Sequence, residues 1–139
     1  MKISLPDATG RMADYTLTGT PIAAGKLPRD AARVVYSAAH VVADPFTASD
    51  PTGPAAIDWN RTMAFRHYLA DLGLGIAEAM DTAQRGMGLD WPGALELIRR
   101  TRAELPDALV ANGCGTDHLD PAHAGSLDDV IRAYLEQVH

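Results

Sequence analysis

Short apolar runs alternate with longer amphipathic stretches along most of this chain, and this alternation constrains the fold more than any other feature. The apolar runs lie at residues 33–42, 74–80 and 109–113, and helical spacing of apolar residues follows them at residues 58–72, 90–105 and 126–139. Strand and helix units in this order form parallel sheets with right-handed crossovers, and the helices pack on the sheet. The sequence therefore predicts an α/β fold of about three βα units.

Capping residues indicate where the three helices begin. Asp58, Asp90 and Ser126 each precede a helical pattern and carry a side-chain oxygen that can accept a hydrogen bond from the first turn. In the first helix Phe65, Leu69 and Leu72 are spaced to form the inner face. The run at residues 33–42 is rich in β-branched residues and nearly uncharged, which is typical of a strand buried on both faces.

The first 32 residues have a different character from the rest. Residues 2–5 and 14–17 alternate polar and apolar side chains around a turn-forming link, which predicts an N-terminal β-hairpin. A connection rich in Pro and Gly follows at residues 20–30. We expect two parts, a hairpin with its linker at residues 1–32 and the βα units at residues 33–139. A loop at residues 43–56 is long enough to carry function.

Composition excludes several classes of protein. The 139 residues include 12 Lys and Arg against 18 Asp and Glu, a net charge of -6, and the basic residues are scattered except on one helix, which does not favour nucleic-acid binding. The single cysteine, Cys114, excludes an intramolecular disulfide and a cysteine zinc cluster. We expect no signal peptide, and the sequence has no apolar run of about 18 residues. We expect a cytoplasmic protein that does not bind membranes.

Polar side chains appear abruptly where the second apolar run ends. Glu78, Asp81 and Thr82 follow it, and Gln84 and Arg85 come directly after them. Chemistry in parallel α/β proteins lies at the carboxyl ends of strands, because the following loops converge there. A carboxylate can act as a general acid or base, a threonine hydroxyl can relay a proton, and the arginine fork can hold a substrate carboxylate. The structural alternative is that Asp81 and Thr82 cap a turn and Arg85 pairs with an acid.

Other polar residues fall at the ends of the remaining strands. His40 lies near the end of the first apolar run, and Asp117 and His118 follow the third. Together with Glu78 and Asp81, such residues can bind a divalent cation, as in sugar-isomerase-like barrels. The alternative is that His40 is a hydrogen-bonded core residue and that His118 and His123 belong to a loop. Trp59 and Trp91 stand at helix starts, where packing explains them.

Three segments carry a resemblance to a known family. Residues 38–45, 77–91 and 113–117 resemble the N-terminal half of the bacterial domain-of-unknown-function 993 family, an uncharacterised family that is similar to the dihydrodipicolinate synthase and N-acetylneuraminate lyase superfamily of Schiff-base aldolases. The resemblance implies a partial (β/α)8 TIM barrel of about three βα units after the hairpin. Such a barrel takes about 250 residues, so three units cannot close it.

The resemblance also implies roles for particular residues. In the superfamily, the loop after the second strand carries hydroxyls that relay protons and hold the substrate carboxylate. Thr82 keeps one such hydroxyl, Ala83 replaces the other polar residue, and Gln84 or Arg85 lies near the family's acid. This departure weakens the case for a pyruvate-type substrate. The Schiff-base lysine belongs to a later strand, and Lys2 and Lys26 do not match it.

The main hypothesis is therefore an aldolase-like lyase portion that acts on an oxo-acid or sugar-derived substrate and uses no cofactor. It needs a C-terminal half that carries the lysine, as a separate chain or in a homo-oligomer. The assigned roles are catalytic for Asp81, Thr82 and Glu78, and substrate-binding for Arg85, Gln84, His40 and Asp117. One alternative is a divalent-metal-dependent isomerase or lyase with His40, Glu78, Asp81 and Asp117 as ligands. Another is a non-enzymatic binding or assembly module that uses its sheet edges and apolar helix faces.

Overall fold

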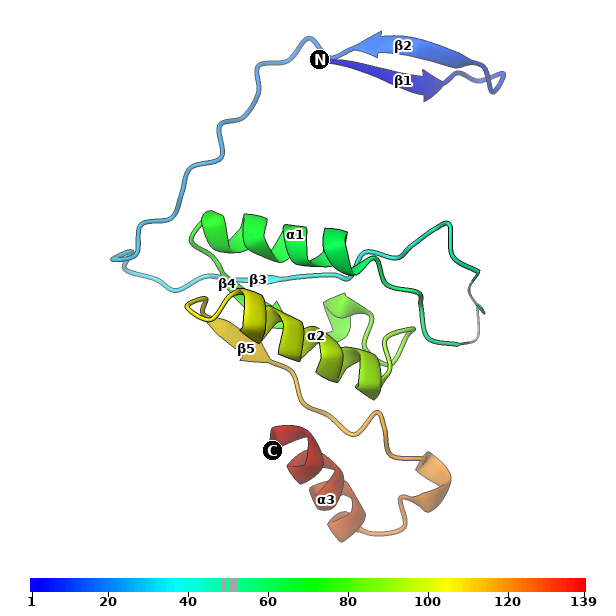
Figure 1. Ribbon diagram of the computed structural model, residues 1–139, viewed down its shortest axis with the longest axis vertical. Coiled ribbons are helices and arrows are strands. Elements are labelled where there is room, and N and C mark those ends of the chain that lie inside the picture. Colours follow the sequence, from blue (N-terminus) through cyan, green and yellow to red (C-terminus); the bar gives the residue numbers. More distant parts are fainter. Residues whose placement is uncertain (49, 51–52) are drawn as a thin grey trace.

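The computed structural model describes residues 1–48, 50 and 53–139, and Figure 1 shows the arrangement of its elements. The strands are β1 (Lys2–Pro6), β2 (Met12–Thr16), β3 (Tyr36–Ala38), β4 (Gly75–Glu78) and β5 (Val110–Asn112). The α-helices are α1 (Trp59–Asp71), α2 (Trp91–Glu104) and α3 (Leu127–Val138), and two short 3₁₀ turns lie at η1 (Asp81–Ala83) and η2 (Pro121–His123). Residues 49, 51 and 52 of the predicted loop lie outside the described residues.

The chain has the mixed α/β fold that the alternation predicts. Strands β3, β4 and β5 form a parallel sheet in sequential order, with α1 between the first two strands and α2 between the last two. The described strands make this sheet and a separate two-stranded sheet, and they do not close a barrel. Both edges of the three-stranded sheet are formed by strands of three residues.

Helices α1 and α2 pack on the same face of the sheet. Glu78, the last residue of β4, accepts hydrogen bonds from Arg66 of α1 and Thr101 of α2. Side chains alternate between faces along a strand, so Ile76 shares the helix-covered face and Ala77 points to the other. Register pairs Ala77 with Ala38 of β3 and with Ala111 of β5. The uncovered face of the sheet therefore carries a row of three alanines.

The helix starts confirm the capping prediction. Asp58, Asp90 and Ser126 accept backbone hydrogen bonds from Arg61, Gly93 and Asp129 respectively. The predicted inner face of α1 is only partly right. Leu69 is buried and Phe65 packs partly buried against the same core cluster, as expected, but Leu72 is only partly buried. The helix also buries Thr62, Met63 and Arg66, which the prediction did not include. The reason is Glu78, which draws the arginine to the inner face of the helix.

The expectation of a long, doubly buried first strand is wrong. Strand β3 covers only Tyr36–Ala38, and Tyr36 is 43% exposed. Because β3 lies at the edge of the sheet and the helices cover one face, its other face has no layer packed on it among the described residues. Val34 and Val35, the apolar residues just before β3, are exposed as well.

The N-terminal hairpin is present and stands apart from the helices and the parallel sheet (Figure 1). Ile3 pairs with Tyr15 across β1 and β2, and most side chains of both strands are exposed. The linker returns to the larger part of the fold at Leu27, whose backbone N–H donates to the Leu72 carbonyl at 2.7 Å. This contact lies just before β4, at the amino-terminal end of the sheet.

Helix α3 is capped by Ser126 and contributes few apolar contacts to the core. Leu127 is 73% exposed, and Ile131 and Tyr134 are also exposed on the same stripe. The predicted role of this stripe as core or interface therefore stays a prediction. In the described part of the chain, no helix has both the length and the apolar character needed to cross a membrane.

Candidate functional site

An open hollow of about 550 Å³ lies at the carboxyl ends of β4 and β5, and we call it the mouth pocket. Its lining residues are Ala79, Met80, Asp81, Arg85, Gly113, Cys114, Gly115, Thr116 and Asp117. They come from the two loops that leave adjacent parallel strands, which is where such folds place their ligands. The structure thus brings three predicted site residues, Asp81, Arg85 and Asp117, to one pocket.

Arg85 joins four segments around the mouth pocket. Its Nη1 donates to the carbonyl of Gly113 at 2.6 Å and to that of Ala79 at 3.3 Å, so it bridges the ends of β5 and β4. Nε and Nη2 donate to the Asp117 carboxylate, and Nη2 also donates to Gln137 Oε1 on α3. A guanidinium has five N–H groups, and these contacts use all of them. In this arrangement Arg85 positions the pocket wall and has no fork free for a substrate carboxylate.

Gln137 is a site residue that the sequence analysis did not single out. Its Oε1 accepts from Arg85 and from the Gly115 backbone N–H, and its Nε2 lies 3.1 Å from Asp117 Oδ1. The signal available in the sequence was its place on α3, one turn after Ala133, which is the buried residue of that helix. A polar residue on the inner side of a helix needs a partner, and Arg85 and Gly115 supply it.

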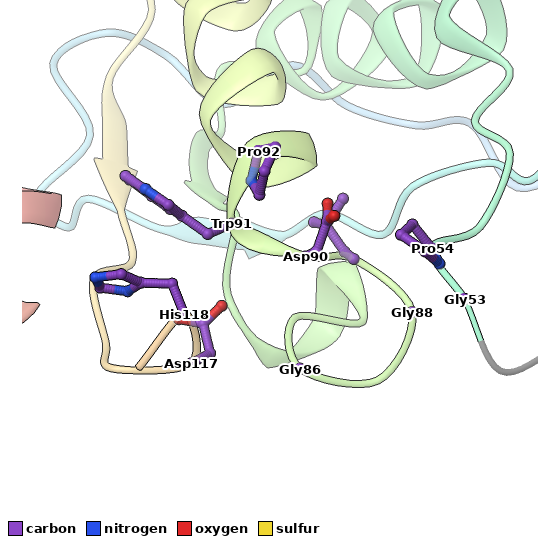
Figure 2. A pocket seen from close by; sticks show the side chains of 10 residues that line it. Gly53, Pro54, Gly86, Gly88, Asp90, Trp91, Pro92, Asp117 and His118 are labelled. Atoms are coloured by element: carbon purple, nitrogen blue, oxygen red, sulfur yellow. The ribbon is translucent and has the colours of Figure 1, made fainter. Parts of the chain in front are cut away.

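A second hollow, of about 440 Å³, shares Asp117 with the mouth pocket (Figure 2). Trp91 and Pro92 at the start of α2 border it, with Asp117 and His118 on one side and Gly53 and Pro54 on the other. The Trp91 ring lies 5.1 Å from the Arg85 guanidinium carbon and 6.0 Å from the His118 ring. Trp91 therefore packs against the cation that organises the mouth pocket, as well as against the helix start.

Asp117 is ionised over the neutral pH range. Partial burial raises the pKa of this carboxyl, but hydrogen bonds from Arg85 and Gln137 and the charge of Arg85 lower it, and the net pKa lies below its ordinary value. The side chain of Arg85 is only 8% exposed, so the ion pair is largely shielded from solvent. An ionised Asp117 and a fully engaged Arg85 give the pocket wall a fixed geometry.

The backbone at the end of β4 is strained. Ala79 has a φ of 51°, in the left-handed region that non-glycine residues seldom adopt. Its N–H donates to Glu78 Oε1 at 3.0 Å, and its carbonyl accepts from Arg85. Such strain persists only where the surroundings impose it, and it is concentrated at functional sites. It turns the chain sharply out of the sheet and brings Asp81 to the pocket.

Glu78 lies away from the mouth pocket, on the helix-covered face of the sheet. Arg66 donates Nε to Oε2 and Nη2 to Oε1, each at 2.6 Å, and Thr101 donates its hydroxyl to Oε2 at 2.7 Å. The side chains of Arg66 and Glu78 are both 0% exposed. This arrangement gives Glu78 a clear structural task, since it ties both helices to β4.

The other predicted residues are distributed around the site. Thr82 and Gln84 are exposed, in and directly after η1, and Gln84 takes a left-handed conformation as the cap of that turn. His40 lies at the end of β3 with its ring 4.7 Å from that of Phe65 on α1. In the part of the chain that the structure describes, no group of three His, Cys, Asp or Glu side chains is arranged to hold a metal ion. The alternative ligand set His40, Glu78, Asp81 and Asp117 is therefore not gathered.

Comparison with protein families gives a match over almost the whole chain. Residues 3–139 match the family described as protein of unknown function (DUF993). The chain belongs to this family. The match covers every element described above except Lys2, the first residue of β1. A search of curated proteins gave no match.

Proposed function

We propose that this chain is the substrate-orienting portion of an aldolase-like (β/α) barrel enzyme, which makes or breaks a carbon–carbon bond in an oxo-acid or oxo-sugar. The observation that supports it is the sheet order β3-β4-β5 with both crossover helices on one face and a pocket at the carboxyl ends. Doubly wound sheets carry helices on both faces, whereas barrels carry them on the outside only. The alanine row then belongs to the inner face of the barrel.

The reacting groups in this proposal come from the mouth pocket. Asp81 lines the pocket and acts as general acid or base, and Thr82 beside it relays a proton through its hydroxyl. Donors for substrate oxygens come from the backbone N–H groups of Cys114 and Thr116 and from the Thr116 hydroxyl, since the N–H groups of Gly113 and Gly115 donate to Glu78 and Gln137. Arg85 and Asp117 hold these two loops in register and do not touch the substrate.

The amine of a Schiff base has to come from outside residues 1–139. Lys2 lies in the hairpin, and Lys26 precedes Leu27, which is bonded to Leu72 at the amino-terminal end of the sheet. Both lysines are therefore remote from the carboxyl ends, where imine chemistry would take place. The lysine-bearing half of the barrel packs against the uncovered sheet face and its edges in this proposal.

Borohydride trapping tests the proposal. The chain is incubated with pyruvate or with a longer 2-oxo acid, reduced, and analysed by mass spectrometry. We expect no adduct on this chain alone, and an adduct on the complementing half when both are present. A reduced imine on Lys2 or Lys26 would overturn the assignment.

A second measurement addresses the orienting role directly. Titration of labelled protein with the same acids, followed by NMR, should shift the amide signals of Asp81, Thr82 and Thr116. Asp81→Asn should weaken the effect, whereas Asp120→Asn, an exposed cap of η2, should leave it unchanged. Shifts confined to other parts of the chain would contradict the placement of the site.

A further inference from the structure

The carboxamide of Gln137 uses every hydrogen-bonding position it has. Oε1 accepts from Arg85 Nη2 and from the Gly115 N–H at 2.6 Å, and Nε2 lies 3.1 Å from Asp117 Oδ1 and 2.7 Å from His118 Nδ1. An amide oxygen has two acceptor positions and an amide nitrogen has two donor hydrogens. One side chain of α3 therefore connects four groups of the loops that form the mouth pocket.

The orientation of this amide is fixed by its neighbours. A guanidinium and a backbone N–H can only donate, so the oxygen of Gln137 has to face Arg85 and Gly115. A flipped amide would put its NH₂ group against both donors and would also face the Asp117 carboxylate with an acceptor. The nitrogen of Gln137 consequently donates toward His118.

This orientation selects one protonation state of His118. Nδ1 has to accept from Gln137, so it carries no proton, and the ring proton lies on Nε2, 3.2 Å from Glu136 Oε2. A proton on Nδ1 would place two donors 2.7 Å apart. The contact between α3 and the loop after β5 is thus compatible with the neutral ring and incompatible with the imidazolium.

We propose that Gln137 is a positioning residue that holds α3 against the mouth pocket only while His118 is neutral, so that protonation of His118 releases this contact. Acidification is therefore the change of conditions that tests this contact. The value of this control for catalysis rests on the proposed function. The hydrogen-bond arrangement itself does not, and it is tested without any substrate.

Some charged groups around His118 favour its protonated form and others oppose it. Glu136 and Asp117 favour the imidazolium, Arg85 opposes it, and Asp120, His123, Asp129 and Arg132 line a hollow beside it. The Glu136 side chain is 63% exposed, so solvent weakens its attraction for the imidazolium. The negative charge of Asp117 is already balanced by the positive charge of Arg85. The direct conflict between two donors at Nδ1 remains, and it is relieved when Gln137 and the imidazole ring separate.

Hydrogen exchange of the Gly115 amide reports on this contact, because its N–H donates to Gln137. We expect its protection factor, corrected for the intrinsic exchange rate, to fall about five- to tenfold between pH 8 and pH 5, the worth of one hydrogen bond. His118→Asn is the matched control, since asparagine places an oxygen near the Nδ1 position and does not titrate. Its Gly115 protection should be the same at both pH values.

Gln137→Glu gives the sharpest test, because it should reverse the direction in which Gly115 protection changes with pH. A carboxylate still accepts from Arg85 and Gly115, but its second oxygen now faces both Nδ1 and the Asp117 carboxylate, and the added negative charge favours the imidazolium. Gly115 protection in Gln137→Glu should therefore be greater at pH 5 than at pH 8. Equal protection of the wild-type amide at both pH values, or a pH dependence that persists in His118→Asn, would overturn the proposal. Either result leaves the trapping experiment on the proposed function unaffected.

Discussion

Arg66 and Glu78 are joined by two hydrogen bonds of 2.6 Å, and neither side chain is exposed to solvent. The pair links α1 to the end of β4, and Thr101 extends it to α2. Arg66 also donates to the carbonyl of His40 at 3.0 Å, which fixes the chain leaving β3. One buried guanidinium on α1 thus links the ends of two neighbouring strands through hydrogen bonds.

Glu78→Gln should destabilise the fold strongly. It leaves the Arg66 charge buried without its counter-ion, and breaking a buried pair in this way costs about 3–5 kcal/mol. Urea unfolding measures the change in the free energy of unfolding. Glu96→Gln is the control, because Glu96 pairs with Arg100 on the half-exposed side of α2 and should cost about 1 kcal/mol or less. Equal effects of the two substitutions would contradict this reasoning.

Gly73→Ala should be more damaging than Gly86→Ala. Both glycines have positive φ, +80° and +72°, so each substitution brings a backbone strain of roughly 1–2 kcal/mol. A Cβ at Gly73 would also lie 2.3 Å from the Leu27 carbonyl oxygen, whereas a Cβ at Gly86 meets nothing within 4 Å. The difference between the two unfolding free energies measures the close contact alone. No difference would mean that the linker at Leu27 is not packed as described.

Asp117 should confer a stability that is lost in acid. Its folded-state pKa lies below the unfolded value, so its contribution is fully present above about pH 4 and is lost as pH falls through the lowered folded pKa. Asp117→Asn should remove this part of the pH dependence and reduce stability at neutral pH. Unfolding followed between about pH 2 and pH 7 tests it, with Asp14→Asn on the hairpin as a control. This window lies below the one assigned to His118.

Cys114 should act as a reporter of the mouth pocket. Its side chain lines the pocket and is exposed, so a thiol reagent should label it in the folded protein. A bound 2-oxo acid should slow the labelling, and Asp81→Asn should remove most of that protection. Cys114→Ser checks that the labelling is specific. Labelling that is indifferent to a bound acid would place the acid elsewhere.

Most of the fold could be predicted from local sequence patterns. The alternation of elements and the caps at Asp58, Asp90 and Ser126 were predictable, because each depends on residues within one turn or one strand. The burial of β3 was not, since the same apolar run suits a central strand and an edge strand. Which face of α1 turns inward also depended on a distant residue, Glu78.

The location of the site could be predicted better than the roles of its residues. The carboxyl ends of β4 and β5 do bring Asp81, Arg85 and Asp117 together. The pairing of Arg85 with an acid was one of the two interpretations open from sequence, and it is confirmed by the 2.8 Å contact with Asp117. Gln137 was missed because its partners lie 19 or more residues away in sequence, where helical periodicity gives no information.

The row of Ala38, Ala77 and Ala111 determines what can approach the uncovered side of the sheet. Methyl groups leave the backbone of three strands within reach, so a facing wall has to supply long side chains to fill the remaining depth. Barrel interiors are otherwise filled by bulky branched residues. In the proposed barrel, a lysine extended from the opposite wall would have the length and slenderness for that space. The small size of the three alanines thus sets a size requirement for any side chains that pack on this face.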